Sequence, residues 1–132
     1  MSKKLINPEE LFDASAFGMS QAVIATTTGL VFVSGQVDWN NQYETTETSV
    51  GGQMRKALKN LRIALEAAGS SIDQLLQIRV YIRGELGEHR NIIAPILVDF
   101  LGESRPAATA IGVASLASPE TLVEIEGIAS TN

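Results

Sequence analysis

The stretch TSVGGQMRKALKNLRIALEAAG, residues 48–69, carries the clearest structural pattern in the chain. Apolar residues recur there at every third or fourth position, as one face of an α-helix requires. These residues are Val50, Met54, Ala57, Leu58, Leu61, Leu65 and Ala68. Serine or threonine before Val50 can cap the first turn, and Gly69 is placed to end the last turn. The pattern predicts a long amphipathic helix that buries one side against the rest of the fold.

Strand patterns flank this helix on both sides. Upstream, QAVIATTTGLVFVSG (residues 21–35) reads as two strands joined by a tight turn at Thr28 and Gly29. Downstream, LLQIRVYIRG (residues 75–84) alternates apolar and polar residues, which is typical of a strand with one buried face. The residues predicted to share that buried face are Leu76, Ile78, Val80 and Ile82.

A second helix and two closing strands complete the chain. The helix is predicted over residues 88–101, with Pro95 either kinking it or marking the start of its regular part. Its inward residues are expected to be Ile92, Ile93, Ile96, Leu97 and Phe100. The closing strands are expected over residues 107–116 and 121–130.

The element order is therefore β-β-α-β-α-β-β, which predicts an α/β (α+β) fold with a mixed sheet and both helices on the same face. Residues 2–19 lack a clear period and are expected to form an arm with a short turn. The opposite sheet face would carry Phe32, Ile128 and the small residues of 107–116, which is too apolar for open water. A partner subunit is the expected cover for such a face.

Composition restricts the classes of function. The 132 residues form one domain, 1–132, with a formal net charge of −5. A nucleic-acid-binding protein normally presents a basic surface, so no nucleic-acid partner is expected. One histidine and no cysteine disfavour a metal site. The chain shows no signal peptide and no apolar run of membrane-spanning length, and a cytoplasmic location without membrane association is expected.

Arg105 is the first candidate functional residue. It precedes Pro106 in ESRPAATAIGVASL (residues 103–116), a segment that otherwise reads as a buried strand. A surface arginine that ends a loop is the simplest interpretation. The alternative is a guanidinium group that binds a carboxylate through two hydrogen bonds. Pro106 is expected to hold Arg105 in an extended conformation.

Two carboxylates and a glycine are the other candidates. In VEIEGIA (residues 123–129), Glu124 and Glu126 alternate with apolar residues, so both should lie on the face away from the helices. They are either solvated on an edge strand or in need of a partner at an interface. In VSGQV (residues 33–37), Gly35 after Ser34 indicates a bulge or a close backbone approach.

Taken together, several of these motifs resemble the reactive intermediate deaminase family, also called Rid, YjgF-like or "endoribonuclease L-PSP", in a divergent branch. The resemblance covers nearly the whole chain. It is carried, in the family's order and spacing, by MSQAV, VFVSGQV, QMRKALKNLRIALEAAG, IRVYIRG, RPAATAIGV and LVEIEGIA.

The resemblance implies a chorismate-mutase-like fold and a homotrimer with three clefts between subunits. It also implies a 2-iminobutanoate/2-iminopropanoate deaminase-like hydrolase with a role in metabolite detoxification. Such an enzyme uses neither cofactor nor metal, and hydrolyses small 2-imino or 2-enamino acids to 2-keto acids and ammonia. The implied partner is thus a small carboxylate substrate.

The same resemblance assigns roles to individual residues. Arg105 would hold the substrate carboxylate, with help from backbone N–H groups of Gly35 and Ala107. Glu124 would position or activate water, and Ser34 falls on the serine of the family's SGQ motif. Met19 and Ala107 depart from the best-studied branch, which has tyrosine and cysteine at these positions.

Two other functions stay open at this point. The chain could be a trimeric protein that binds or senses a small carboxylate, such as a keto acid, without turning it over. A ribonuclease follows from one family label, but the acidic balance and the single histidine weigh against it.

Overall fold

The computed structural model describes residues 2–132. Its elements along the chain are β1 (Lys3–Ile6), the 3-10 helix η1 (Ala14–Phe17), β2 (Ala22–Ala25), β3 (Leu30–Gln36), α1 (Val50–Ala67), η2 (Ile72–Gln74), β4 (Leu75–Arg83), η3 (Leu86–Glu88), α2 (Arg90–Leu101), β5 (Ala107–Val113) and β6 (Val123–Ser130). Within this part of the chain, six strands form one sheet in the order β1-β2-β3-β6-β4-β5. Only β4 and β5 run parallel among the neighbouring strands.

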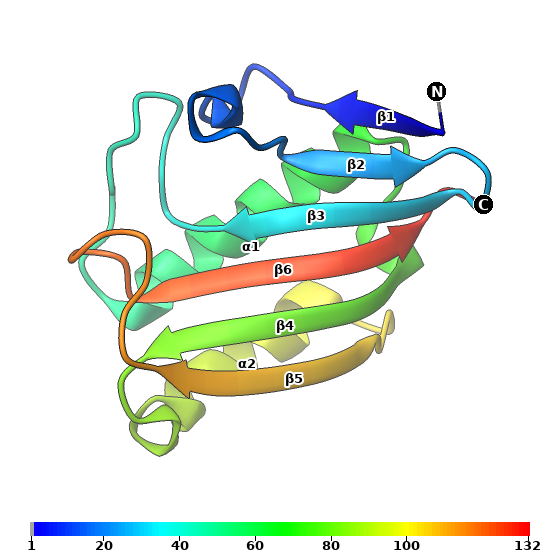
Figure 1. Cartoon of the computed structure of the whole chain (residues 1–132). Helices are drawn as coiled ribbons and strands as arrows, with labels where there is room; N and C mark the ends of the chain where they lie inside the picture. The colour runs from blue at the N-terminus through cyan, green and yellow to red at the C-terminus, as the bar shows by residue number, and fades with distance from the viewer. Residues whose placement is uncertain (1) are drawn as a thin grey trace.

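The predicted fold class is confirmed. The sheet is mixed, and α1 and α2 lie on the same side of it (Figure 1). Strand β6 is inserted between β3 and β4, so the chain's last strand occupies the middle of the sheet. A parallel pair needs a crossover connection, and α2 supplies it between β4 and β5.

Helix α1 forms where the sequence predicts it. The Ser49 side chain accepts a hydrogen bond from the Gly52 N–H and caps the first turn. Gly69 has a φ of +79°, a left-handed conformation that glycine adopts without steric cost, and it ends the helix as expected. The buried face of α1 includes Met54, Leu58, Leu61 and Leu65, so the predicted periodicity is correct.

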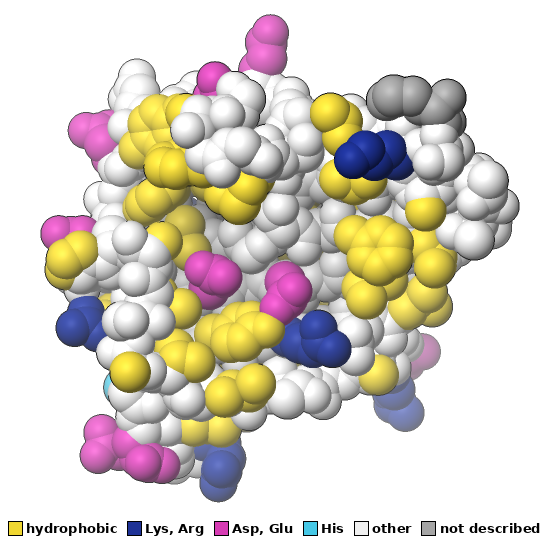
Figure 2. Space-filling view, viewed as in Figure 1, with side chains coloured by type: hydrophobic (Ala, Val, Ile, Leu, Met, Phe, Trp, Pro, Cys, Tyr) yellow, Lys and Arg dark blue, Asp and Glu magenta, His cyan; other side chains and the backbone are white. Residues whose placement is uncertain are grey.

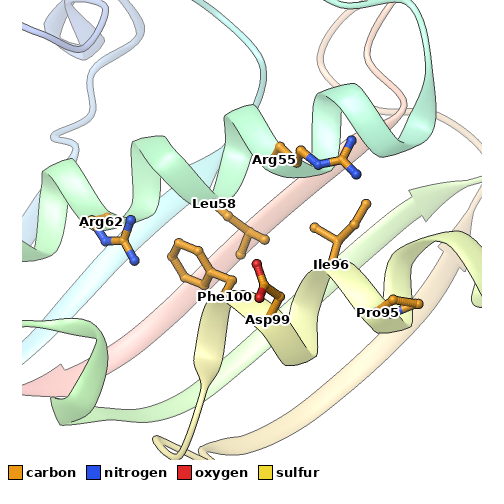
Figure 3. A pocket seen from close by; sticks show the side chains of 7 residues that line it. All are labelled: Arg55, Leu58, Arg62, Pro95, Ile96, Asp99 and Phe100. Carbon is orange, nitrogen blue, oxygen red and sulfur yellow. The ribbon is translucent and has the colours of Figure 1, made fainter.

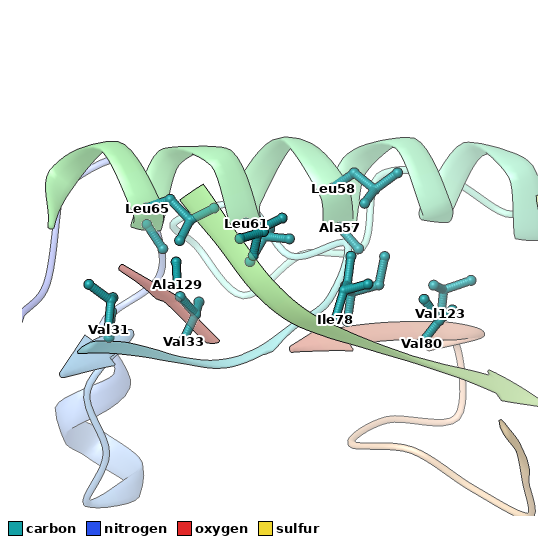
Figure 4. Packing of buried hydrophobic residues seen from close by; sticks show 14 of the residues in the cluster. Val31, Val33, Ala57, Leu58, Leu61, Leu65, Ile78, Val80, Val123 and Ala129 are labelled. Atoms are coloured by element: carbon teal, nitrogen blue, oxygen red, sulfur yellow. The ribbon is translucent and has the colours of Figure 1, made fainter. Parts of the chain in front are cut away.

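The hydrophobic core lies between α1 and the sheet. Leu58, Leu61 and Leu65 point from the helix toward side chains of the strands (Figure 4). The strand residues that meet them include Val31, Val33, Ile78, Val80, Val123, Ile125 and Ala129, all of which are buried. Strict alternation in β6 places every second side chain in this core and leaves Glu124, Glu126 and Ile128 on the other face, as predicted.

The N-terminal segment contains a strand that the sequence does not reveal. Residues Lys3–Ile6 form β1 and pair antiparallel with β2, so the expectation of an irregular arm is wrong there and the sheet has one strand more than predicted. Only Ile6 of its four residues is buried. An edge strand this short, with lysines at two positions, has no alternation that a sequence pattern can detect.

Two inward predictions are also wrong. A register shift between Leu75 and Gln77 marks a bulge where β4 pairs with β6, so Leu75 is buried and Leu76 is 50 % exposed. In α2, Ile93 is buried but Ile92 is half exposed. The helix contains Pro95 in its interior, so Pro95 does not mark the start of its regular part.

The last two strands of the chain are shorter than the predicted ranges, 107–116 and 121–130. Strand β5 ends at Val113 and β6 begins at Val123, because residues 114–122 form bends and turns between them.

Neither α1 nor α2 has the length and apolar character needed to cross a bilayer, and no other described helix has it.

The sheet face without helices, here called the open face, is half apolar as predicted. Phe32 is 45 % exposed on it, and Ile111 on β5 is exposed as well. Figure 2 views the molecule from this side and shows acidic and basic side chains near the centre, among hydrophobic ones. Residues 107–112 of β5 are all exposed. The chain therefore leaves one face of its sheet incomplete.

Candidate functional site

Glu124 and Gly35 form the centre of the candidate site, where β3 and β6 pair irregularly. The register shifts between Val33 and Gln36, so Ser34 and Gly35 lie in a bulge. A Cβ atom at Gly35 would overlap the Glu124 carboxylate. Both of the alternatives predicted for Gly35, a bulge and a close approach, are therefore found together. Any larger residue at 35 would displace the carboxylate.

Ser34 ties the N-terminal segment to the sheet. Its hydroxyl donates a 2.6 Å hydrogen bond to the Ser20 carbonyl, and its N–H donates to the Gln21 carbonyl at 2.9 Å. Two buried glutamines extend the connection, since Gln36 Nε2 donates to Gln21 Oε1 at 2.8 Å. Gln21 Nε2 in turn donates to the Phe12 carbonyl at 2.8 Å. The Ser34 hydroxyl thus uses its hydrogen in a bond to the backbone, and the lone pairs of the hydroxyl oxygen remain available to accept hydrogen bonds.

A cavity of about 310 Å³ opens beside this bulge. Four of the residues that the sequence singled out line it together: Met19, Ser34, Gly35 and Glu124. The rest of its lining is largely apolar and comes from the segments before β2, after β3 and between β5 and β6. It consists of Phe12, Ala14, Phe17, Ser20, Gln21, Val37, Trp39 and Ala117. Ligand sites commonly have this character, a mostly apolar wall with a few polar groups.

Among the residues that the structure describes, Glu124 is the only charged one in the cavity lining. It is half-buried, and burial raises its pKa above the ordinary value, with a further rise from the negative charge of Glu126. A carboxyl group whose pKa is raised in a cavity is a candidate for proton transfer.

Glu126 is held next to Glu124 by a tyrosine. The Tyr81 hydroxyl on β4 donates a short hydrogen bond to the Glu126 carboxylate, and this bond raises the pKa of Tyr81. The two residues are diagonal neighbours in the sheet, because Tyr81 pairs with Glu124 and Arg79 pairs with Glu126. Tyr81 therefore helps to keep the Glu126 charge on the open face, close to Glu124.

Arg105 and Ala107 do not line this cavity. Ala107 pairs with Gln77 at one end of β4, whereas Glu124 pairs with Tyr81, four positions further along β4. Four strand residues span about 13 Å, and the full width of β4 also lies between β5 and β6. Within one chain, the predicted arginine and glutamate are therefore not neighbours.

The backbone at Arg105 differs from the prediction. The sequence predicts that Pro106 keeps Arg105 extended, but the φ angle of Arg105 is +47°. This left-handed conformation is strained for a residue with a Cβ atom. The chain turns sharply there between the end of α2 and β5, and the Ser104 hydroxyl fixes the turn by donating to the Ile72 carbonyl at 2.7 Å. Tertiary contacts thus override the local preference of a residue before proline.

Sequence patterns missed the aromatic wall of the cavity. Phe12, Phe17 and Trp39 line the cavity, and they pack with Tyr43 as a cluster with ring centroids 5.1–6.4 Å apart. They come from residues 11–19, part of the expected arm, and from residues 38–44, between β3 and α1. These two segments contain four of the chain's seven aromatic residues. This enrichment was the available signal for an aromatic cluster, because exposed loops rarely carry so many rings.

A second cavity of about 380 Å³ lies between α1 and α2, away from the open face. Arg55 and Arg62 line it from α1, and Asp99 and Phe100 from α2 (Figure 3). The Arg62 guanidinium lies over the Phe100 ring, 4.7 Å from its centroid. None of the predicted site residues lines this groove. The Glu124 cavity is therefore the candidate site.

Comparisons with known proteins show which family the sequence resembles. A family model described as "Endoribonuclease L-PSP" matches residues 13–131. A RutC family protein of Pyrococcus horikoshii is 31% identical over 111 residues, which is 83% of this chain and 84% of the relative.

Solved structures give the same result. A Rid family protein of unknown function from Yersinia pestis has a TM-score of 0.87 and 27% identity, and the match covers 97% of this chain and 98% of that one. RidA from an Antarctic Psychrobacter has a TM-score of 0.85 and 26% identity, with 96% and 98% covered.

Proposed function

The chain belongs to the Endoribonuclease L-PSP family, the family of the Rid and YjgF-like proteins, and from this membership we propose that it hydrolyses 2-imino or 2-enamino acids to 2-keto acids and ammonia. The reaction would take place in a cleft between two copies of the chain in a homotrimer, without metal or cofactor. The observation that carries the proposal is the half-buried Glu124 carboxylate on the wall of an amino-acid-sized cavity.

Glu124 is suited to act on water. Its raised pKa lies closer to neutral pH than that of an exposed glutamate, and a base of this kind transfers protons more efficiently. Water held by Glu124 adds to the imine carbon, so a C–O bond forms while Glu124 accepts the proton. Glu124 passes this proton to nitrogen, which gives a carbinolamine with an OH and an NH2 group on the same carbon. Glu124 then transfers the hydroxyl proton to nitrogen, the C=O bond forms as the C–N bond breaks, and ammonia leaves. The imine carbon is already electrophilic, so positioning of water is the main requirement.

Arg105 would bind the substrate carboxylate from a neighbouring copy. Within its own chain it is remote from Glu124, it is exposed, and its strained φ of +47° is the kind of backbone conformation that gathers at functional sites. The half-apolar open face gives a second copy a surface to cover. Backbone N–H groups of Gly35 and Ala107 would assist Arg105, and Ser34 would contribute its hydroxyl oxygen.

Met19 favours a second candidate, a trimer that binds a small carboxylate such as a keto acid without turnover. Met19 lines the cavity, and its thioether cannot donate or accept a proton as a tyrosine hydroxyl does. The same arginine and the same cavity would serve this function. The two candidates differ only in whether the imine is consumed.

The test generates imines in situ with an amino-acid oxidase and traps the free imine with semicarbazide. Active protein should lower semicarbazone formation in proportion to its concentration, and Arg105→Ala should lose this effect. Arg90→Ala, which removes an exposed arginine outside the cavity, is the matched control. Semicarbazone formation unchanged across several amino acids would reject the deaminase. Saturable binding of a keto acid by calorimetry, in the same preparation, would then support the binding protein.

A further inference from the structure

We propose that the substrate carries a large apolar side chain, with an aromatic ring preferred, and that Phe12, Phe17 and Trp39 bind it. This inference rests on the proposed function, because it takes Glu124 as the residue beside the reacting carbon. It concerns the part of the cavity that no catalytic role explains.

The three rings stand on the wall of the same cavity as Glu124. Phe12 and Trp39 meet edge to face, with centroids 5.1 Å apart, and Phe17 lies 6.4 Å from each of them. Aromatic side chains prefer such edge-to-face contacts, and a ligand ring can extend the array. A substrate whose reacting carbon lies at Glu124 therefore has an aromatic wall within the same cavity for its side chain.

Charge restricts the side chain further. Within residues 2–132 of a single chain, the cavity lining contains neither lysine, arginine nor histidine, and Glu124 is its only charged residue. Arg105 of the neighbouring copy would already be paired with the substrate carboxylate, so an acidic substrate side chain would meet the negative charge of Glu124 without a further cation to balance it. A short side chain, such as a methyl group, would leave most of the roughly 310 Å³ filled only by water against apolar walls. A large apolar group matches both the charge and the volume.

The aromatic wall is built in advance and fixed to the sheet. The Tyr43 hydroxyl donates to the Asp13 carbonyl at 2.9 Å and joins the two aromatic loops. The Phe12 carbonyl accepts from Gln21 Nε2 at 2.8 Å, which anchors the segment to the buried glutamine pair. A binding surface that needs no reordering loses less entropy when a ligand binds.

Two residues of the cavity lining keep a large exposed apolar surface in the single chain. Phe17 is 54 % exposed and Met19 is 50 % exposed, although both line the cavity. Large apolar side chains exposed together at a cavity commonly mark a binding surface. A bound ring would remove part of this surface from water, which is favourable in proportion to the apolar area buried.

The experiment compares imines made from phenylalanine, leucine, alanine, glutamate and lysine in the semicarbazide assay, at matched rates of imine generation. We expect kcat/KM for the phenylalanine imine to exceed that for the alanine imine by roughly tenfold or more, as side-chain discrimination in apolar pockets allows. Phe17→Ala should reduce that ratio several-fold. Val98→Ala, which truncates a 70 % exposed residue on α2, is the matched control and should leave the ratio unchanged.

The outcomes separate this inference from the proposed function. Hydrolysis with equal rates, or with a preference for the alanine, glutamate or lysine imine, would keep the deaminase and overturn the aromatic pocket. If no imine is hydrolysed, calorimetry with phenylpyruvate and pyruvate decides the pocket independently. Tighter binding of phenylpyruvate by tenfold or more, lost in Phe17→Ala, would retain the pocket without the enzyme. Equal binding, or none, would overturn it.

Discussion

The two faces of the sheet differ in how they are completed. On one face, α1 covers the central strands and Leu61 and Ile78 are fully buried. On the open face, the same strands present Glu124, Glu126 and Phe32 to solvent, with no element of the described chain packed over them as α1 and α2 are on the other side (Figures 1 and 2). Strand alternation generates both faces equally. The covered face should therefore determine stability, and the open face activity and assembly.

The largest effect expected from this division is on catalysis. Glu124→Gln keeps the size of the side chain but removes the base, so the imine-hydrolysis rate should fall roughly 10²- to 10⁴-fold, the usual contribution of a general base. Stability should not fall, because burial disfavours the charged form of Glu124. Glu88→Gln, at an exposed position outside the cavity, is the control. Activity within a few-fold of the parent would contradict the role assigned to Glu124.

The complementary change on the covered face is Leu61→Ala. It should lower the free energy of unfolding by about 2–5 kcal/mol, since a fully buried leucine loses its contacts and leaves a cavity. Urea unfolding followed by circular dichroism measures this change. Leu76→Ala removes an equal side chain that is 50 % exposed in the β4 bulge, and its cost should be clearly smaller. Equal costs at the two positions would contradict the register of β4.

The next largest effect is expected on assembly, when a charge is placed on the open face. Phe32→Asp removes a half-exposed ring and adds a charge to the surface that a second copy would cover. The loss of roughly 2 kcal/mol of apolar burial per subunit should shift the mass by light scattering from about three chains toward the single chain of 14.1 kDa. Thr27→Asp, in the exposed β2–β3 turn, adds the same charge as a control. A parent protein that is already monomeric would reject the trimer.

The smallest expected effect is a pH shift caused by Glu126. Its charge contributes to the raised pKa of Glu124, so Glu126→Gln should move the acid limb of the pH–rate profile to lower pH. Tyr81→Phe keeps the Glu126 charge and should not lower that limb. An acid limb that stays in place in Glu126→Gln would show that burial alone raises the pKa of Glu124.

The same shift has a defined sign for stability. Because the folded-state pKa of Glu124 is raised, the folded chain binds the proton more tightly than the unfolded chain does. This contribution is complete below the ordinary value of 4.5 and is lost as the pH rises through the raised value. Glu126→Gln should make this loss smaller, which urea unfolding between pH 4 and pH 7 would reveal.

The sequence by itself determined the features that repeat along the chain. The period of α1 and its ending at Gly69 followed from side-chain pattern and backbone preference, as did the two faces of β6. Hydrophobic periodicity is a local signal, and it is strong where an element is long and half-buried. The close approach at Gly35 could also be predicted from the sequence, because a glycine inside a strand often marks a bulge or a close approach of another group to the backbone.

Only the tertiary structure decided the features that depend on distant contacts. Strand β1 exists because β2 offers it a free edge, and the strained Arg105 backbone exists because the chain must turn from α2 into β5. The two aromatic loops are joined by the hydrogen bond from Tyr43 to Asp13, residues that lie 30 positions apart. The separation of Arg105 from Glu124 likewise follows from the position of β4 between β5 and β6 and from the register of these strands. Such features arise from strand order and long-range hydrogen bonds, which leave no period in the sequence.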